Sequence, residues 1–433
     1  MAKAERRGSR RALVCLSRRF SRWAACLCLS LLPCLVFAQA TQAVPAAQPA
    51  SQHGVQARNA PIRIGVITML PGTIFWERFG HDAIVVDDPA LPEPISYNFG
   101  FFDLDEPGFV RRFIQGDMQY QLLALPLSQD LAYYRQVGRG VQLQWLDFTP
   151  AQAQQLARDL AFNALPQNAR YRYDYFTDNC ATRVRDALDR ALDGALQRRW
   201  QATSQGNTYR GEAVRLASPA TWMALGFDVG LGPAADRPLT RWQDAFVPMH
   251  LAQLLRETRL ADGRPLVLAE TTLLPHQLPA EPAAQRRWWW AWLAAGIAIG
   301  AGLLALQRRH PAAVAAFAAV FWLLCGVLGV LMLYLWLGTE HRFGWANRNA
   351  LLLNPLCLLL LPAVPALLRN RRPRAWFTWL LRIVAACVIA AILVLWLSIG
   401  DAQRNAHWVA LLAPIHFALA MSWAFARKPL APP

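Results

Sequence analysis

The sequence predicts a soluble domain of the α+β class followed by an all-α membrane domain of about five transmembrane helices. Five apolar stretches are each long enough, at about 20 residues, to cross a bilayer as a helix, and all of them lie in the last third of the chain. The preceding segment mixes strand-like runs with helix-like segments. We therefore expect five parts: a signal peptide (1–40), a flexible linker (41–61), a periplasmic domain (62–287), a transmembrane domain (288–426) and a cytoplasmic tail (427–433).

The N-terminus has the three parts of a secretory leader. A basic segment precedes the apolar run "WAACLCLSLLPCLVFA", and the small residues of "AQA" (38–40) suit a signal peptidase. A retained membrane anchor is the alternative. The next segment, "TQAVPAAQPASQHGVQARNA", is rich in Ala, Gln and Pro, which is typical of a flexible linker. The chain that follows is therefore expected to be exported.

The exported domain shows both strand and helix signals. Three runs have the β-branched content of strands: "IRIGVITML" (62–70), "HDAIVV" (81–86) and "ISYNF" (95–99). Ser128 is expected to cap one helix, and Thr149, followed by Pro150 at the first helical position, to cap another.

Cys180 is the only cysteine of the exported domain. Exported cysteines usually pair, so an unpaired one is either buried and inert or retained for its chemistry, and the residues alone leave both readings open. In "DNCATRVRDALD" a capping residue precedes apolar positions at helical spacing, which places Cys180 in the first turn of a helix. Free backbone N–H groups and the helix dipole there favour a thiolate, and Arg183 would add to the effect.

A thiol nucleophile also needs a base, and His81 is the best-placed histidine. It follows a glycine at the start of a predicted strand, where a side chain can be held rigidly. An ordinary hydrogen-bonded histidine at a strand end is the alternative. His250 and His276 have no comparable setting. The order of a histidine on a strand, a further strand and a cysteine at a helix start is that of a circularly permuted papain-like (NlpC-like) fold.

The five apolar stretches are 288–306, 311–337, 350–368, 376–398 and 408–426. Basic loops such as "RNRRPR" (369–374) mark the inner side, so the soluble domain and the loop "GTEHRFGWANRN" (338–349) share the outer side. Arg286 and Arg287 depart from this rule. The net charge of +16 is concentrated in the leader and the inner segments, so it does not indicate a nucleic-acid partner.

Four segments resemble the Lnb-type bacterial membrane proteins, a family named for a lipoprotein N-acyltransferase: "WERFGHDAIVV", "YNFGFFDLDEPGFVRRFIQGDMQY", "YDYFTDNCATRVRDALD" and "TEHRFGWANRNALLLNPL". The resemblance implies a papain-like cysteine domain fused to membrane helices, located in the bacterial inner membrane and facing the periplasm. It makes Cys180 the nucleophile and His81 the general base. Asn98, on the next predicted strand, is expected to orient the imidazole.

The resemblance implies an acyltransferase that moves an acyl chain from a phospholipid donor, through a Cys180 thioester, to the N-terminal amine of a bacterial lipoprotein. The alternatives are a papain-like hydrolase of lipid or cell-wall peptide, and a non-enzymatic membrane assembly factor. Candidate substrate-binding residues are Arg183, His341, Arg342, Asn347 and Asn349. For the loop residues among them, ordinary surface polarity is the alternative. No metal or cofactor is implied.

Overall fold

The computed structural model describes residues 61–284, 288–397 and 402–425. The predicted signal peptide (1–40), the linker up to residue 60 and the predicted tail (427–433) lie outside the described residues.

The soluble domain is built on a seven-stranded sheet with the order β6-β4-β3-β2-β1-β5-β7, in which every neighbouring pair is antiparallel. The strands are β1 (Arg63–Met69), β2 (His81–Asp87), β3 (Ile95–Phe101), β4 (Met118–Pro126), β5 (Val141–Leu146), β6 (Arg170–Tyr173) and β7 (Val267–Leu274). The first three coincide with the predicted strands, which are thereby confirmed.

The helices of the soluble domain are η2 (Phe75–Glu77), α2 (Phe109–Gln115), α3 (Leu127–Gln136), α4 (Pro150–Asn163), α5 (Cys180–Ala191), α6 (Ala195–Trp200), α7 (Tyr209–Ala217), α8 (Thr221–Gly230), η3 (Pro233–Asp236), α9 (Arg241–Asp244) and α10 (Pro248–Glu257). Thr149 caps α4 as predicted, with Pro150 at its first position. The prediction for Ser128 is wrong, because α3 begins at Leu127, which makes Ser128 its second residue, and the N-cap position is Pro126. The Ser128 backbone N–H instead donates to Glu93 Oε2 at 3.1 Å.

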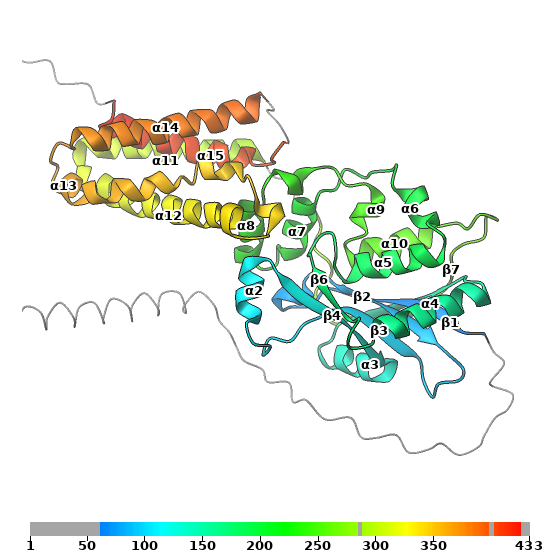
Figure 1. The fold of residues 1–433 in the computed structure, drawn as a ribbon. Coiled ribbons are helices and arrows are strands. Elements are labelled where there is room, and N and C mark those ends of the chain that lie inside the picture. The colour runs from blue at the N-terminus through cyan, green and yellow to red at the C-terminus, as the bar shows by residue number, and fades with distance from the viewer. Residues whose placement is uncertain (1–60, 285–287, 398–401, 426–433) are drawn as a thin grey trace, which may run out of the picture. The chain divides into compact units, whose positions relative to one another are not determined.

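The sheet has two buried faces, because side chains alternate along each strand. Val66 and Ile84 pack against α5, whereas Ile67 and Ala83 pack on the opposite side, against α3. Figure 1 shows α5 on one side of the sheet and α3 on the other. Polar residues on these strands also alternate between the two faces. A polar residue in register with Ile84 faces α5, and one in register with Ala83 faces α3.

Helix α5 begins at Cys180, as the capping pattern predicted. The Asn179 side chain accepts from the Thr182 backbone N–H at 2.9 Å, and Thr182 Oγ1 accepts from the Asn179 backbone N–H at 2.7 Å. This reciprocal capping box fixes the start of the helix. Val184 and Leu188 are fully buried against the sheet, which anchors the helix and the cysteine at its first position.

The described residues include five segments long and apolar enough to span a membrane, as predicted. They are α11 (Trp289–Arg309), α12 (Pro311–Gly338), Arg348–Leu368, α14 (Ala375–Trp396) and α15 (Ala406–Trp423). The third is irregular: it consists of η5 (Arg348–Leu351), η6 (Pro355–Ala363) and α13 (Val364–Leu368). Proline lacks a backbone N–H, so Pro355 and Pro362 each remove a donor that a continuous α-helix would use. Asn354 caps η6 by accepting from the Leu356 backbone N–H.

Candidate active site

His81 is the first residue of β2 and follows Gly80, which has a φ of 77°. This left-handed conformation suits glycine and turns the chain into the strand. His81 Nε2 lies 3.0 Å from Asn98 Oδ1 on the neighbouring strand β3. Asn98 pairs with Ala83 in the sheet and faces α3 with it. The predicted base and the predicted orienting residue are thus in direct contact on one face of the sheet.

Two residues that sequence reasoning missed determine the orientation of the Asn98 amide. Its nitrogen Nδ2 donates to Ser96 Oγ at 2.9 Å and to Asp130 Oδ2 at 2.9 Å. Ser96 Oγ in turn donates to Asp130 Oδ2 at 2.6 Å. Because a carboxylate only accepts, the Asn98 amide nitrogen must face Asp130 and its oxygen must face His81. Nε2 of His81 then carries the proton, and Nδ1 keeps a free lone pair.

The imidazole of His81 is neutral at pH 7. Burial lowers its pKa to about 4, and the positive charge of Arg139 acts in the same direction. The negative charge of Asp130 and the hydrogen bond with Asn98 oppose this shift but do not overcome it. A neutral imidazole with a free Nδ1 is the form that a general base requires.

The Cys180 thiol lies where the start of β2 meets the end of β3. Three backbone N–H groups favour its ionised form: those of Cys180 and Ala181, and that of Asp82, the residue directly after His81. Gly100, near the end of β3, has a φ of 95°, and a Cβ at this position would lie 3.7 Å from Cys180 Cβ. The Cys180 side chain therefore lies beside the backbone of both strands that carry His81 and Asn98.

The pKa of the Cys180 thiol is raised to about 12, so the prediction of a lowered pKa is wrong for the resting structure. Burial is the main cause, and the Asp82 carboxyl adds to it. The backbone N–H groups at the helix start do lower the pKa, as expected, but desolvation of the thiolate outweighs them. Arg183 was expected to stabilise the thiolate. Its positive charge instead pairs with Asp178, with Arg183 Nη2 donating to Asp178 Oδ2 at 2.7 Å.

Asp82 is a second group that sequence reasoning missed. It is fully buried and faces α5, because it alternates with His81 along β2. Its Oδ1 accepts from Thr68 Oγ1 at 2.7 Å, whereas Oδ2 has no hydrogen-bond partner among the described residues. Burial raises the pKa of this carboxyl to about 7. The only sequence signal was a polar residue at an otherwise apolar strand position.

The other two histidines of the soluble domain have partners of their own. His250 Nδ1 lies 3.1 Å from Asp244 Oδ2. Burial lowers the pKa of His250, but Asp244 and the negative charge of Glu212 outweigh it, so the pKa is raised. His276 Nδ1 accepts from the Gly140 backbone N–H at 2.9 Å. Both are held by local contacts, in agreement with the preference for His81.

Three of the predicted substrate-binding residues lie around the segment that leads into Cys180. The Arg183 guanidinium stacks 4.0 Å above the Tyr171 ring. Arg342, in the loop after α12, donates from Nη2 to Asp174 Oδ2 at 3.1 Å and to Thr177 Oγ1 at 2.7 Å. In the same loop, His341 Nε2 lies 3.0 Å from the Phe113 carbonyl oxygen. Arg342 thus connects the outer loop to the chain just before the cysteine.

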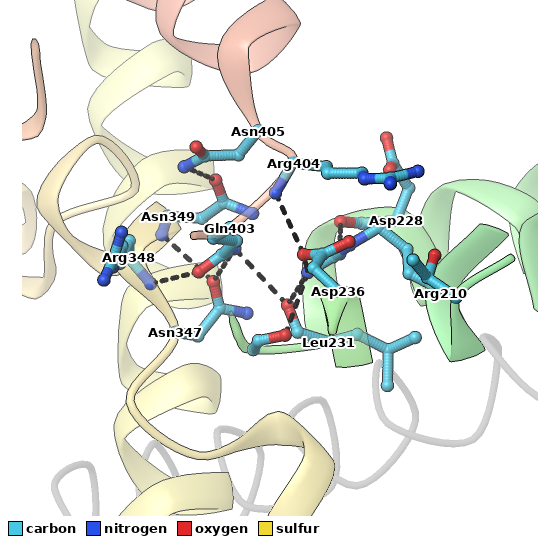
Figure 2. Close-up of polar contacts among 12 residues, drawn as sticks. Arg210, Asp228, Leu231, Asp236, Asn347, Arg348, Asn349, Gln403, Arg404 and Asn405 are labelled. Carbon is cyan, nitrogen blue, oxygen red and sulfur yellow. Dashed lines mark hydrogen bonds and ion pairs between the residues drawn. The ribbon is translucent and has the colours of Figure 1, made fainter. Parts of the chain in front are cut away.

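Asn347 and Asn349 join the membrane domain to the soluble domain. Both donate from Nδ2 to the Val229 carbonyl oxygen, at 2.7 Å and 3.1 Å respectively. Their own amide oxygens accept from Gln403 at 2.9 Å and from Asn405 at 2.9 Å. Figure 2 shows Asn347 and Asn349 beside their partners Gln403 and Asn405. With both amide groups occupied by protein partners, their role as substrate-binding residues stays a prediction.

A buried ion pair extends the same junction. Arg210 Nη2 lies 2.9 Å from Asp236 Oδ2 and also donates to the Leu231 carbonyl oxygen at 2.7 Å. The Arg404 backbone N–H, just before α15, donates to Asp236 Oδ2 at 2.9 Å (Figure 2). The loop regions of the membrane domain are therefore bonded to the soluble domain at several points.

Comparison with known families gives two matches. Residues 55–222 match the Lnb N-terminal periplasmic domain, and residues 282–428 match the Lnb transmembrane domain. No curated protein and no solved structure matches the chain. The first match contains His81, Asn98 and Cys180 together with Asp82 and Asp130.

Proposed function

Because the chain belongs to the Lnb family, with both its periplasmic and its transmembrane domain, we propose that it is a thiol-dependent acyltransferase of the bacterial inner membrane. Cys180 takes an acyl chain from a membrane phospholipid and passes it to the N-terminal amine of a bacterial lipoprotein. The soluble domain acts as a circularly permuted papain-like cysteine domain.

One observation carries this proposal: the His81 imidazole is oriented by Asn98 at 3.0 Å, while the backbone N–H of the next residue faces the Cys180 thiol. In the proposal, the thiol, the imidazole and the Asn98 amide act as the nucleophile, the base and the group that orients the base, as in a nucleophilic acyl-transfer site. The His81–Asn98 pair faces α3 and Cys180 begins α5, so the proposal adds a direct contact of the imidazole with the thiol at the end of the sheet. The strand order of His81 and Asn98, followed by Cys180 at a helix start, agrees with a permuted papain-like domain.

In the first step, the Cys180 sulfur attacks the ester carbonyl carbon of the phospholipid while His81 Nδ1 accepts the thiol proton. The backbone N–H of Cys180 is suited to stabilise the oxyanion. The tetrahedral intermediate collapses by breaking the ester C–O bond, and His81 returns the proton to the leaving alkoxide. The products are a Cys180 thioester and a lysophospholipid.

In the second step, the lipoprotein amine attacks the thioester carbonyl. His81 accepts a proton from the nitrogen and donates it to the departing Cys180 sulfur, so that an amide forms and the thiol is restored. Because both groups are neutral at rest, the thiol is deprotonated only as attack occurs. Burial of the thiol also keeps water away from the thioester between the two steps.

The decisive test is the intact mass of the detergent-purified full chain after incubation with phosphatidylethanolamine. We expect a gain of one acyl chain that hydroxylamine removes, and no gain in Cys180→Ser. Addition of a diacylated lipopeptide with a free N-terminal amine should then discharge the thioester and yield a triacylated peptide.

Two outcomes would contradict the proposal. A chain without any mass gain, whose cellular role survives Cys180→Ser, would mean an inert thiol. A thioester that releases free fatty acid at the same rate with and without the lipopeptide would mean a hydrolase. Asp186→Asn serves as a control for folding around α5, because it removes the ion pair between Arg185 and the exposed Asp186 while keeping the thiol and the imidazole.

A further inference from the structure

The soluble domain exposes apolar side chains on three elements that its sheet core does not cover. We call this set the apolar rim; it consists of Ile74, Phe75, Trp76, Val110, Ile114 and Trp222. Val110, on α2, is 64% exposed, and Trp222, on α8, is 68% exposed. Large apolar side chains that cluster in this way on a surface mark an interaction site.

Contacts with the membrane domain place both ends of the rim beside the bilayer. Directly after α12 ends at Gly338, the Glu340 backbone N–H donates to the Gln115 carbonyl oxygen of α2 at 2.7 Å. At the other end, the Val229 carbonyl oxygen of α8 accepts from Asn347. Helices α2 and α8 are thus bonded to the loop that joins two membrane spans. Such a loop emerges at the bilayer surface, so the two helices lie at that level.

Aromatic contacts make the rim continuous between these helices. Phe75, in η2, stacks on Trp222 with ring centroids 6.2 Å apart. The adjacent Trp76 meets Phe102 edge-on at 5.8 Å, and Phe102 stacks on Phe109 of α2 at 5.6 Å. Tryptophan and phenylalanine side chains of this kind are stabilised at membrane–water interfaces.

A row of stacked rings leads from the rim to the cysteine. Phe102 stacks on Tyr120 at 4.9 Å, and Tyr120 stacks on Tyr173 at 4.3 Å. A Cβ on Gly100 would lie 3.8 Å from Tyr173 Cε2 and 3.7 Å from Cys180 Cβ. The row therefore ends at the glycine that lies beside the Cys180 side chain.

We propose that the apolar rim inserts into the outer surface of the phospholipid bilayer and that the acyl donor passes from there along the aromatic row to Cys180. The role of the row rests on the proposed function, whereas insertion of the rim does not. The occupant is the bilayer because the rim is continuous with the loop between two spans and consists of the side chains that such an interface favours.

Site-specific photo-crosslinking tests the insertion. The full chain carries benzoylphenylalanine in place of Val110 or of Trp222 and is reconstituted into vesicles of phosphatidylethanolamine and phosphatidylglycerol. The control position is Phe162 of α4, which is 66% exposed and is outside the rim. After irradiation, we expect phospholipid adducts about tenfold more abundant at positions 110 and 222 than at 162, as interfacial burial requires.

The same experiment in the Cys180→Ser background separates this proposal from the proposed function. Adducts that persist there show insertion that is independent of the thiol, even if no acyl transfer is found. Equal adduct yields at all three positions would overturn the proposal, as would cross-links from positions 110 and 222 to a second copy of the chain in place of lipid.

A second variant tests whether the acyl donor reaches the thiol from the inserted rim, which is the first part of the proposed route. In Val110→Ser/Ile114→Ser, we expect the ratio of Cys180 loading from vesicles to loading from dissolved p-nitrophenyl butyrate to fall about tenfold, because only the vesicle donor depends on insertion. A ratio equal to that of the unmodified chain would overturn the route. Circular dichroism and Tm of the variant show whether its fold is retained.

Discussion

The Asp130 carboxylate accepts a hydrogen bond from the Asn98 amide nitrogen at 2.9 Å. This contact between α3 and β3 determines which amide atom faces His81 and therefore which imidazole nitrogen carries the proton. The hydrogen bonds of the Asp130 side chain are with Asn98 and Ser96, so in the proposed mechanism Asp130 acts as a positioning residue.

Asp130→Asn should reverse this orientation. The new amide can donate to Asn98, which lets Asn98 rotate and present its nitrogen to His81, so that Nδ1 no longer holds a free lone pair. We expect acyl loading of Cys180 to fall about 100-fold, within the range for loss of a general base. Removal of the negative charge also lowers the pKa of His81 further, since Asp130 now raises it. The acid limb of the rate–pH profile should therefore move to lower pH.

Ser96→Ala is the matched control, because it removes the Ser96 hydroxyl's bonds with Asp130 and Asn98 but leaves the bond from Asn98 to Asp130 that orients the amide. We expect only a small loss of loading rate. If Asp130→Asn loads at the unmodified rate with an unchanged pH profile, the positioning role is wrong.

The Cys180 thiol should react slowly with iodoacetamide at pH 8. Its pKa is about 12, so the alkylation rate should rise steadily to pH 9 without a plateau. Asp82→Asn removes the nearby negative charge that raises this pKa, and the rate at pH 8 should increase. Mass spectrometry of the peptide that contains Cys180 measures the rate directly.

Thr68→Val provides an intermediate case. The Thr68 hydroxyl lowers the pKa of Asp82 by bonding its ionised form, so its loss should keep more of the carboxyl neutral at pH 8. The alkylation rate should then lie between those of the unmodified chain and Asp82→Asn. A reactivity plateau at neutral pH in the unmodified chain would show a stabilised thiolate and contradict this electrostatic description.

Asp82 should also make stability depend on pH. Its carboxyl releases a proton near pH 3.8 when unfolded and near pH 7 when folded. Between these values the folded state binds more protons, so the free energy of unfolding falls as pH rises, by on the order of 4 kcal/mol in total. Asp82→Asn removes this decline. The Tm in detergent should drop more between pH 5 and pH 8 for the unmodified chain than for the variant.

The effect of His81 on the pH dependence of stability has the opposite sign to that of Asp82, which gives an internal control. Its pKa is about 4 when folded and 6.5 when unfolded, so its contribution to stability is present above pH 6.5 and is lost as pH falls toward 4. His81→Gln should therefore make the decline of Tm with rising pH steeper below pH 6.5. Identical pH slopes in all three proteins would contradict both assignments.

Those parts of the site that depend on local sequence could be predicted. The position of Cys180 follows from a cap at Asn179 and from helical spacing of the apolar residues after it, all within one segment. His81 at the start of a strand follows from a glycine and the β-branched run after it. The membrane spans follow from length and composition alone.

The parts that depend on distant pairing could not be predicted. Asp130 meets Asn98 only because α3 packs on β3, and nothing in either segment specifies the partner. The pKa of Cys180 was predicted in the wrong direction because the helix start is local information, whereas burial of the thiol and the proximity of Asp82 are set by the whole fold. The broken third span likewise needed the structure, because prolines alone do not decide such a break: Pro414 lies inside the continuous helix α15.

The junction between the two domains gives a last prediction, which separates two roles for Asn347. Its amide nitrogen donates to the Val229 carbonyl oxygen at 2.7 Å, and its amide oxygen accepts from Gln403 at 2.9 Å. Asn347→Ala removes both bonds. The Val229 carbonyl oxygen keeps the bond from Asn349, but the buried Gln403 amide nitrogen keeps only a 3.4 Å contact with the Leu231 carbonyl oxygen, at a cost of about 1–3 kcal/mol. We expect a lower Tm and faster amide hydrogen exchange around residues 229–231.

A substrate-binding role would produce a different pattern. Asn347→Ala would then leave the Tm and the exchange at 229–231 unchanged and raise the KM for phospholipid. Asn163→Ala is the control for loss of a single asparagine contact elsewhere, because Asn163 Nδ2 donates only to the nearby Asn168 carbonyl oxygen at 3.0 Å. The nitrogen and the oxygen of the Asn347 amide both have hydrogen-bond partners within the protein. These contacts predict that Asn347→Ala lowers the Tm and speeds amide exchange at residues 229–231.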